Sequence, residues 1–385
     1  MIQYSTHHIG EQQTPVRMAL FASGGHPEAS LFIYPSAPLF EDAAAETMTA
    51  LESMYAHESL RGMDPVFMRW FLSDITNQAA AVPEHSGEPF GECCPISVVG
   101  QPPLGHGKAV LWVHMKGGIA HGPYLNSSST QANSLGLVEF TDGILEVRCA
   151  NTRSGHSRDS YAETGDLLSG YGLTLNLFQL FLEKNCVRTW FFVRDIDTNY
   201  AGMVRARNET FDRHGLTSDT HYIASTGIGA DMPSADKTVS LDALAIRGDP
   251  APEIHYLYAP THMNRTSDYG VAFERGTVVD TPGKRRIYIS GTASIDNKGR
   301  IVHPGDARRQ LDRMSDNIDA LLHEAGCSRR DLIYGILYVR DPTDARAARE
   351  HMDREYPGLP CAVVLAPVCR PGWLVEMECA AVTER

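Results

Sequence analysis

The sequence lacks the features that mark membrane-spanning and secreted proteins. No apolar run reaches the about 18 residues that a transmembrane helix needs. The N-terminus has no basic segment followed by an apolar core, so we expect no secretory signal. The eight cysteines form no dense, regular framework, and the adjacent Cys93 and Cys94 cannot easily bridge to each other. We therefore expect reduced thiols and a cytoplasmic protein.

Positive charge is also scarce, with 34 Lys and Arg residues against 47 Asp and Glu residues. The resulting net charge of −13 gives no electrostatic footprint for nucleic acid. It still permits a small anionic substrate, because a local group of arginines can oppose the overall field.

Several short catalytic motifs are absent as well. The chain contains neither a G-x-x-x-x-G-K-[ST] phosphate loop nor a G-x-S-x-G nucleophile elbow. His323-Glu324 lacks the second histidine of a metal-binding helix. We therefore expect no metal and no cofactor.

What is present is a soluble composition, 43% hydrophobic and 21% charged, in a chain of 385 residues, enough for two or three domains. Residues 1–16 are polar, which predicts a loose arm. Hydrophobic periodicity then predicts strands, helices and strands in one order that recurs along the chain. The predicted helices cover residues 41–55, 165–184, 200–214, 305–325 and 344–356.

Three anchors support a repeat. A predicted strand runs into Asp74, Asp195 and Asp341, and a later strand of each segment carries His114, Ser240 or Glu376 at what we take as the corresponding position. The sequence therefore predicts an N-terminal arm (1–16), a degenerate unit (17–130), a second unit (131–250) and a C-terminal unit with the candidate acid (251–385). The alternative is two such units behind an unrelated N-terminal part.

Units of this kind predict an α+β fold in which helices cover one face of each sheet. The other face is apolar and must be buried. Three units in one chain can close their open faces against each other as an internal pseudo-trimer, with clefts between units where small ligands bind. We therefore expect a monomer or a low-order homo-oligomer.

The last 110 residues or so resemble the Rid (YjgF-type) family. Four segments carry the resemblance: Tyr288–Gly291, Asp296–Val302, Gln310–Ile318 and Val375–Ala380. The resemblance implies homotrimer-like packing with sites between units, and hydrolysis of enamines or imines as the simplest activity. That activity uses an arginine for the substrate carboxylate, and the matching position here is Leu359 or Pro360. This departure speaks against plain imine deamination.

A longer stretch, from about residue 187 to the end, resembles the chorismatase branch of the same superfamily. The matching segments are Trp190–Ile196 with Tyr200 and Arg207, Ala224–Gly229, Tyr256–Pro260 with Arg265 and Phe273–Arg275, Ser290–Ile295, and Val368–Arg370 with Glu376. The resemblance implies removal of pyruvate from chorismate, a small dianion. The substrate-binding residues it implies are Arg275, Arg265, Tyr258, Arg207, Tyr200, Thr226, Gly227, Thr292 and Ala293. Asp296–Gly299 departs from the branch and has the plainer Rid form.

Glu376 is the candidate catalytic acid. Protonating an enol ether near neutral pH requires a carboxyl group that keeps its proton, and burial in a partly apolar cleft raises a carboxyl pKa. Glu378 shares the face of Glu376 on an alternating strand, so its charge would raise that pKa further. The alternative is that both glutamates belong to the solvent face of the strand.

Cys369, seven residues before Glu376, is the second catalytic candidate. In the resemblance, a cysteine here accompanies formation of 3-hydroxybenzoate instead of the dihydrodiol. A thiol could assist displacement or aromatisation. A buried structural cysteine is the alternative, as a solvated surface charge is for each arginine.

Overall fold

The computed structural model describes residues 1–22, 25–82, 94–105, 107–127, 134–155 and 159–385. In this part of the chain the strands form three six-stranded sheets, each with the same strand order. The orders are β1-β2-β3-β6-β4-β5, β7-β8-β9-β12-β10-β11 and β13-β14-β15-β18-β16-β17. One pair in each sheet is parallel (β4–β5, β10–β11 and β16–β17), and the other neighbours are antiparallel. The predicted α+β fold of three tandem units is confirmed.

The elements follow the same sequence in each unit. The first contains β1 (Gln3–Ile9), β2 (Thr14–Phe21), β3 (Glu28–Ile33), α1 (Phe40–Tyr55), β4 (Met63–Leu72), α2 (Ile75–Gln78), β5 (Ile96–Val99) and β6 (Ala109–Gly117). The second contains β7 (Ile119–Ser127), β8 (Ser134–Phe140), β9 (Leu145–Thr152), α4 (Ser160–Leu177), α5 (Leu182–Asn185), β10 (Cys186–Val193), α6 (Ile196–Arg213), β11 (Ala224–Gly229) and β12 (Val239–Arg247). The third contains β13 (Glu253–Leu257), β14 (Gly276–Thr281), β15 (Lys284–Ala293), α7 (Ala307–Glu324), β16 (Leu332–Val339), α8 (Ala345–Glu355), β17 (Cys361–Leu365) and β18 (Val375–Glu384).

The prediction of a loose N-terminal arm was wrong. Residues 3–9 form β1, which pairs with β2 at the edge of the first sheet. Its polar sequence gave no apolar signal, because an edge strand exposes much of its surface. In the same way β7 pairs within the second sheet, although the predicted boundary assigned it to the first unit. That boundary itself, like Cys93, lies outside the described residues.

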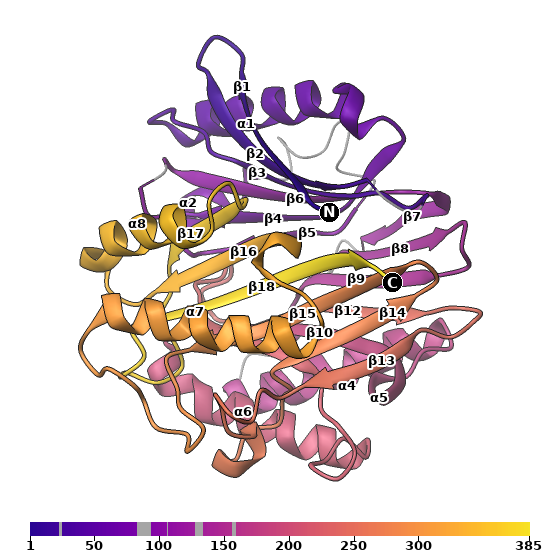
Figure 1. Ribbon diagram of the computed structural model, residues 1–385, viewed down its shortest axis with the longest axis vertical. Helices are drawn as coiled ribbons and strands as arrows, with labels where there is room; N and C mark the ends of the chain where they lie inside the picture. Colours follow the sequence, from indigo (N-terminus) through magenta and orange to yellow (C-terminus); the bar gives the residue numbers. More distant parts are fainter. Residues whose placement is uncertain (23–24, 83–93, 106, 128–133, 156–158) are drawn as a thin grey trace.

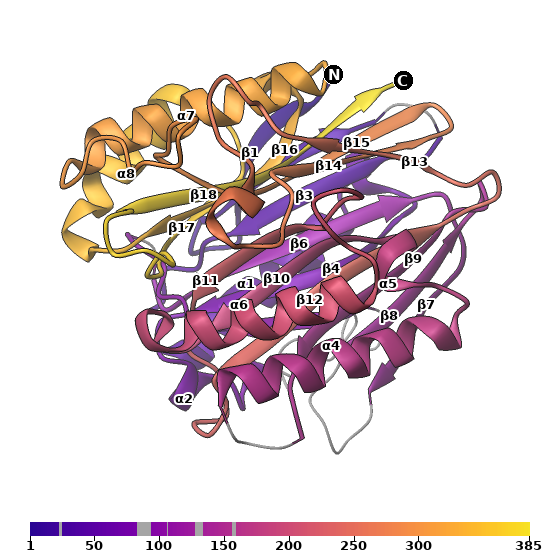
Figure 2. The ribbon, with the colours of Figure 1, turned by 90° about the horizontal axis from the view of Figure 1, so that it is seen from below.

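The helices lie on the outside and the sheets face one another (Figure 1). One apolar cluster joins α1 to the outer face of the first sheet, and a second joins α4 and α6 to the second sheet. Figure 2 shows α4 and α6 side by side on that face. The inner faces of all three sheets contribute to a single central cluster, which includes Phe71, Phe192 and Ile336. The internal pseudo-trimer is therefore how the apolar faces become buried.

Helix α7 illustrates how the sequence determines an outer layer. Asp306 accepts a hydrogen bond from the Arg309 amide and so caps the first turn. Leu311, Met314 and Ile318 recur at helical spacing, and all are buried against the third sheet. Gly326 follows the helix at φ 73°, a conformation that suits glycine at a helix end.

The three units are tied together by buried charges at their centre. Arg69 on β4 is fully buried and forms an ion pair with Asp242 of the second unit at 2.8 Å. Its guanidinium also lies 3.8 Å from Glu378 of the third unit. Removing one partner would leave a buried charge uncompensated, so this cluster fixes how the units dock.

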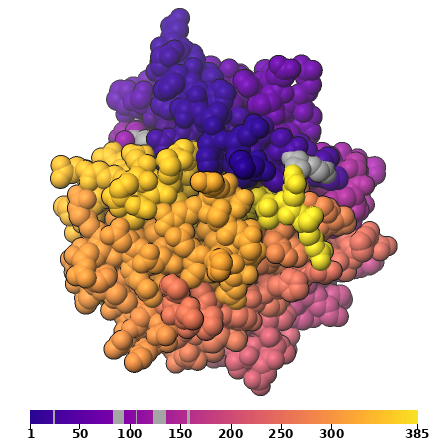
Figure 3. All heavy atoms as spheres, in the orientation of Figure 1, coloured from indigo at the N-terminus to yellow at the C-terminus, as the bar shows by residue number. Residues whose placement is uncertain are grey.

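The first and third units also contact each other directly. Figure 3 shows the N-terminal residues, in indigo, lying against yellow and orange residues of the third unit. The Tyr4 hydroxyl donates to the Leu332 carbonyl at 2.7 Å, and the Tyr34 hydroxyl donates to the Cys361 carbonyl at 2.7 Å.

Among the described residues, no helix has the length and apolarity to cross a membrane.

Strand register corrects one anchor of the predicted repeat. Tyr338 pairs with Glu376 on β18, and the equivalent Phe192 pairs with Ser240 on β12. In the first sheet the equivalent Phe71 pairs with Val110, so Val110 and not His114 is the counterpart of Glu376. The prediction of His114 was wrong because β6 begins closer to Asp74 in the sequence than that prediction required. Of these three positions, only the third carries a carboxylate.

Candidate active site

A cleft between the second and third units contains most of the predicted site residues. Its walls come from α6, β11, β15, β18 and the loops before β14 and β18. About 160 Å³ between the walls is available to the centres of water-sized molecules. The cleft lies between two units, where small-molecule sites are common. Backbone bridges between Ala224 and Glu274 and between Ile228 and Val368 hold the two units together beside it.

Glu376 lies on the inner wall of this cleft, near the start of β18. Its side chain is only 5% exposed, so the alternative of a solvent-facing strand glutamate is wrong. Burial raises the pKa of Glu376 to about 8, and the nearby charge of Glu378 acts in the same direction. Arg275 and Arg188 oppose this rise without cancelling it. Near neutral pH the carboxyl group therefore keeps its proton.

Glu378, two residues further along the same face, is in a different environment. It accepts hydrogen bonds from Arg188 at 2.8 Å and from the Trp190 indole at 2.7 Å. The guanidinium of Arg69 also lies near the Glu378 carboxylate, at 3.8 Å. Glu378 is thus a structural carboxylate bound at the junction of the units, whereas Glu376 faces the cleft.

A glycine makes room for the Glu376 carboxyl group. Strand β15 shifts register between Ile289 and Thr292, and Gly291 lies within this irregularity. A Cβ atom on Gly291 would come within 2.2 Å of the Glu376 Oε1 atom and 2.8 Å of its Cδ atom. The Gly291 amide donates to the Thr226 hydroxyl at 3.0 Å, which links β15 to β11 of the neighbouring unit.

Two buried arginines line the same cleft. Arg207 on α6 is 1% exposed and Arg275 is 4% exposed. Among the described residues, the Nε and Nη2 atoms of Arg207 and the Nε atom of Arg275 have no hydrogen-bond partner. Arg275 uses its Nη2 atom to donate to the Asn264 carbonyl at 3.1 Å. Buried guanidinium groups with unpaired donors are suited to bind carboxylates of a ligand.

Tyr200 and Cys369 both line the cleft, and each affects the pKa of the other. Burial raises the pKa of the Cys369 thiol to about 12, and the nearby Glu376 contributes to the rise. Burial also raises the pKa of the Tyr200 phenol, again with a contribution from Cys369. Both groups therefore stay protonated near neutral pH, and Cys369 is a thiol and not a thiolate.

The structure brings together eight of the eleven predicted site residues. Those lining the cleft are Glu376, Cys369, Arg275, Arg207, Tyr200, Thr226, Gly227 and Ala293. Arg265, Tyr258 and Thr292 do not line it. Arg265 is paired with Glu274 at 3.8 Å and lies over the Tyr258 ring at 4.3 Å. Thr292 pairs in register with Met377, so its side chain lies on the opposite face of the sheet from Glu376. There it is fully buried and donates to the Ser290 carbonyl.

Three side chains stand out among the cleft residues that sequence reasoning did not assign to the site. Arg370 lies over the rings of Tyr269 and Trp373, at 4.6 and 4.9 Å from their centroids. All three line the cleft. Arg370 directly follows Cys369 in a segment that the family resemblance had already highlighted, so that signal was present. Tyr269 had none, because it comes from a short 3-10 helix in an irregular loop (Thr266–Tyr269).

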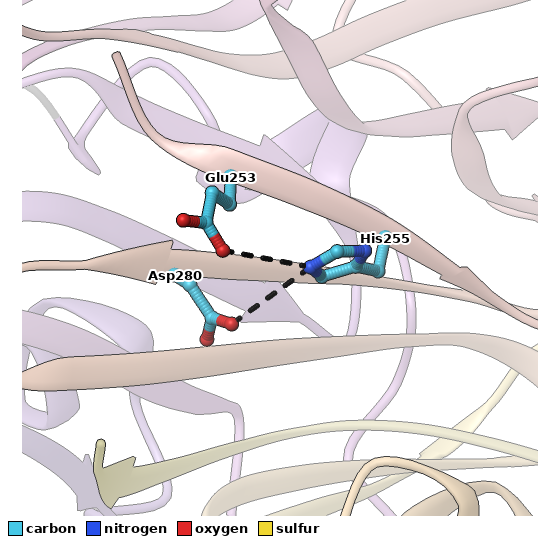
Figure 4. A group of neighbouring side chains, drawn as sticks. All are labelled: Glu253, His255 and Asp280. Carbon is cyan, nitrogen blue, oxygen red and sulfur yellow. Dashed lines mark ion pairs between the residues drawn. The ribbon is translucent and has the colours of Figure 1, made fainter. Parts of the chain in front are cut away.

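One group of side chains has metal-ligand types but lies elsewhere, on β13 and β14. His255 lies 4.0 Å from both Glu253 and Asp280 (Figure 4). Two of the three residues are exposed. Arg285 already binds Asp280 at 2.7 Å, and Arg385 binds Glu253 at 2.6 Å. A cation would have to displace these arginines, so we assign no metal site to the group.

Comparison with known proteins places the third unit in a family. The family model for endoribonuclease L-PSP matches residues 277–383. A RutC family protein from Pyrococcus abyssi is 31% identical over 100 residues, which are 26% of this chain and 79% of that protein. The 3-aminoacrylate deaminase RutC from Acinetobacter baylyi is 29% identical over 99 residues, 25% of this chain and 77% of that protein. The chain therefore belongs to the Rid family, to which L-PSP and RutC proteins belong.

The arrangement of all three units has a more particular counterpart. The crystal structure of a chorismatase matches with a TM-score of 0.63 and 21% sequence identity. The match covers 85% of this chain and 96% of the other. The protein thus has the fold of a chorismatase over most of its length.

Proposed function

We propose that the protein is a chorismatase-like enzyme that removes pyruvate from chorismate, giving 3-hydroxybenzoate. The dihydroxycyclohexadiene carboxylate is the alternative product. The observation that carries the proposal is a buried Glu376 carboxyl group with its pKa raised to about 8, in one cleft with Arg207 and Arg275. A proton donor beside two carboxylate-binding groups matches a dianion with an enol ether.

In this proposal Glu376 acts as the general acid. Its proton passes to the methylene carbon of the enol ether, and the π electrons of the double bond form the new C–H bond. Positive charge then develops on the carbon that carries the ether oxygen. The Glu376 carboxylate left behind lies beside this charge and stabilises it in a cleft of low dielectric. For the dihydrodiol, water adds to this carbon and the bond from this carbon to the ether oxygen breaks, so pyruvate leaves and the oxygen stays on the ring as a hydroxyl group. For 3-hydroxybenzoate, the neighbouring ring hydroxyl displaces the ether oxygen from the ring carbon, pyruvate leaves with the ether oxygen, and loss of a ring proton aromatises the ring.

The two arginines would hold the substrate in place. Their unpaired N–H groups provide the donors for the two carboxylates of chorismate, which fixes the enol methylene relative to Glu376. The Arg370 guanidinium, which lies over the rings of Tyr269 and Trp373, is a third cationic group at the cleft.

Mass balance distinguishes the two products. Loss of pyruvate with aromatisation of the ring to 3-hydroxybenzoate consumes no net water, whereas the dihydrodiol route consumes one. In this proposal the protonated Cys369 thiol and the Tyr200 hydroxyl, which both line the cleft, restrict water and move a proton during aromatisation. We expect Cys369→Ala to shift product from 3-hydroxybenzoate towards the dihydrodiol, measured by liquid chromatography. An unchanged product ratio would remove Cys369 from this role.

A second candidate function is that of a Rid-fold enzyme acting on another small acid, such as an enamine, an imine or a related biosynthetic intermediate. The likeness of the third unit to a 3-aminoacrylate deaminase favours it. The position of the carboxylate-binding arginine in that activity corresponds to Leu359 or Pro360 here, and Leu359 is buried against Gly335. Ammonia release from a freshly generated enamine would support this candidate, and its absence alongside pyruvate release from chorismate would exclude it.

A ligand-binding protein without catalysis is the third candidate. The variant Glu376→Gln separates it from both enzymes. An enzyme of either kind loses turnover in this variant while keeping its fold, whereas a pure binding protein has no turnover in the wild type.

A further inference from the structure

A second cavity lies where the three sheets meet, apart from the catalytic cleft. It is lined by residues of β3, β6, β9, β10, β15, β16 and β18, and each of them is buried. It shares no lining residue with the catalytic cleft. We call this space the junction cavity. Its polar lining residues are Glu28, His114, Arg148 and Arg286, with Trp112, Trp190, Tyr288 and Tyr334 as its aromatic ones.

The charges around the junction cavity do not balance. Glu28 accepts from Arg286 and from Lys284, the latter at 3.0 Å. Glu146 accepts from Lys116 and from Arg148, the latter at 3.0 Å. Two carboxylates thus face four basic side chains, all buried. The two arginines balance the two carboxylates, so the excess positive charge is carried by the two lysines. Burial, with the nearby Arg286, lowers the pKa of Lys116 to about 7, and burial also lowers the pKa of Lys284, which a bound anion would oppose.

An arginine that lines the cavity has an unpaired, buried donor. Among the described residues, the Nε atom of Arg148 has no hydrogen-bond partner, and neither does the Nδ1 atom of His114. Arg148 is 7% exposed, so bulk water does not solvate its guanidinium freely. Aromatic side chains complete the wall, and the edges of aromatic rings carry partial positive charge. An unpaired buried donor beside excess positive charge calls for an anion.

The size of the cavity restricts which anion fits. About 20 Å³ is available to the centres of water-sized molecules. One water needs about 10–15 Å³ of such space, so the cavity has room for one small species and not for a carboxylate metabolite. We propose that the junction cavity is a binding site for one chloride-sized inorganic anion, held by Arg148 and Arg286, which stabilises the docking of the three units.

The direct test is thermal unfolding of the purified protein in sodium chloride and in sodium gluconate at equal ionic strength. Gluconate is too large for the cavity, so it controls for general salt effects. We expect chloride to raise Tm by on the order of 2 °C more than gluconate does, with a saturable dependence on concentration. Equal curves in the two salts would overturn the proposal.

Matched variants separate this cavity from the catalytic cleft, whose arginines could also bind chloride. Arg148→Lys keeps the positive charge but loses the Nε donor, and we expect it to abolish the chloride-specific shift. Arg275→Gln removes an arginine from the catalytic cleft and should keep the shift. The reverse pattern would assign the anion to the cleft and contradict the proposal.

A second measurement needs no variant and so covers the case in which Arg148→Lys fails to fold. Crystals of the wild-type protein grown or soaked with bromide should show an anomalous scattering peak within hydrogen-bond distance of Arg148. A diffraction data set of adequate anomalous signal with bromide only at the protein surface or in the catalytic cleft would contradict the proposal.

Discussion

Glu376 combines burial, a negatively charged neighbour and a place in the cleft, and each has a measurable consequence. In the folded protein its pKa is about 8, against an ordinary value of 4.5. Below pH 4.5 the carboxyl group is protonated in both folded and unfolded states. As the pH rises from 4.5 towards 8, only the unfolded state loses the proton, so the wild-type protein loses stability across this window.

We therefore expect Glu376→Gln to gain stability relative to the wild type as the pH rises from about 5 to about 8. Glutamine has no proton to lose in this pH range, so the variant does not lose stability in the way that the wild type does. Thermal unfolding at several pH values measures the difference in Tm. The exposed Glu384, on the same strand, provides the control Glu384→Gln, which should follow the wild type. Parallel pH dependences for wild type and Glu376→Gln would contradict a raised pKa.

Gly291 sets the position of the Glu376 carboxyl group, so Gly291→Ala should impair turnover without unfolding the protein. The added methyl group would come within 2.2 Å of the carboxyl oxygen and force the side chain to move. We expect kcat to fall by roughly tenfold or more, since small displacements of a catalytic group are costly. Gly172→Ala in α4 is the control, because no atom lies within 4 Å of its added Cβ. Unchanged kcat in Gly291→Ala would refute the positioning role.

Single residues also show where sequence reasoning stops. Glu376, Arg207 and Arg275 could be predicted because family motifs marked them, and the structure brings them into one cleft. Family motifs marked Arg265 in the same way, yet its guanidinium forms an ion pair with Glu274. A motif indicates that an arginine is present, but which carboxylate it faces depends on contacts between distant segments.

At the scale of elements, β18 carries two carboxylates on one face with different partners. The charge of Glu378 contributes to the raised pKa of Glu376, so Glu378→Gln should lower that pKa. The alkaline limb of the pH–rate profile should then move to lower pH, measured as kcat against pH. Glutamine retains an acceptor for Trp190, which limits the structural damage. Glu384→Gln is again the control, and a profile that stays in place or moves to higher pH would contradict the coupling.

The elements hardest to predict from the sequence were β1 and β7, the first strands of their units, which lie at sheet edges. Long amphipathic helices such as α7 and buried strands such as β16 follow from their hydrophobic patterns. The strand β1 has a polar sequence, and only pairing with β2 makes it a strand. Pairing between neighbouring strands is a tertiary property, so local pattern does not predict it.

At the scale of the whole molecule, the three sheets bury their inner faces against one another within one chain. The sequence could predict three units and the need to cover their apolar faces. It could not predict the ion pairs at the centre, because Arg69, Asp242 and Glu378 come from three different units.

Closure within one chain has a consequence for assembly. We expect the 42.3 kDa chain to sediment as a monomer or a low-order oligomer, since the inner faces of the three sheets already bury one another within the chain. Analytical ultracentrifugation over a range of concentrations measures this. A trimer that persists at the lowest concentration would count against internal closure.

In the proposed reaction Glu376 protonates chorismate in a cleft between the second and third units. The most direct measurement is release of pyruvate from chorismate by the pure wild-type protein and by Glu376→Gln, coupled to lactate dehydrogenase. We expect steady release by the wild type and a loss of roughly 10²–10⁴-fold in kcat for the variant, which should remain folded. No pyruvate from a folded wild-type protein, or equal rates for the two proteins, would contradict this reaction.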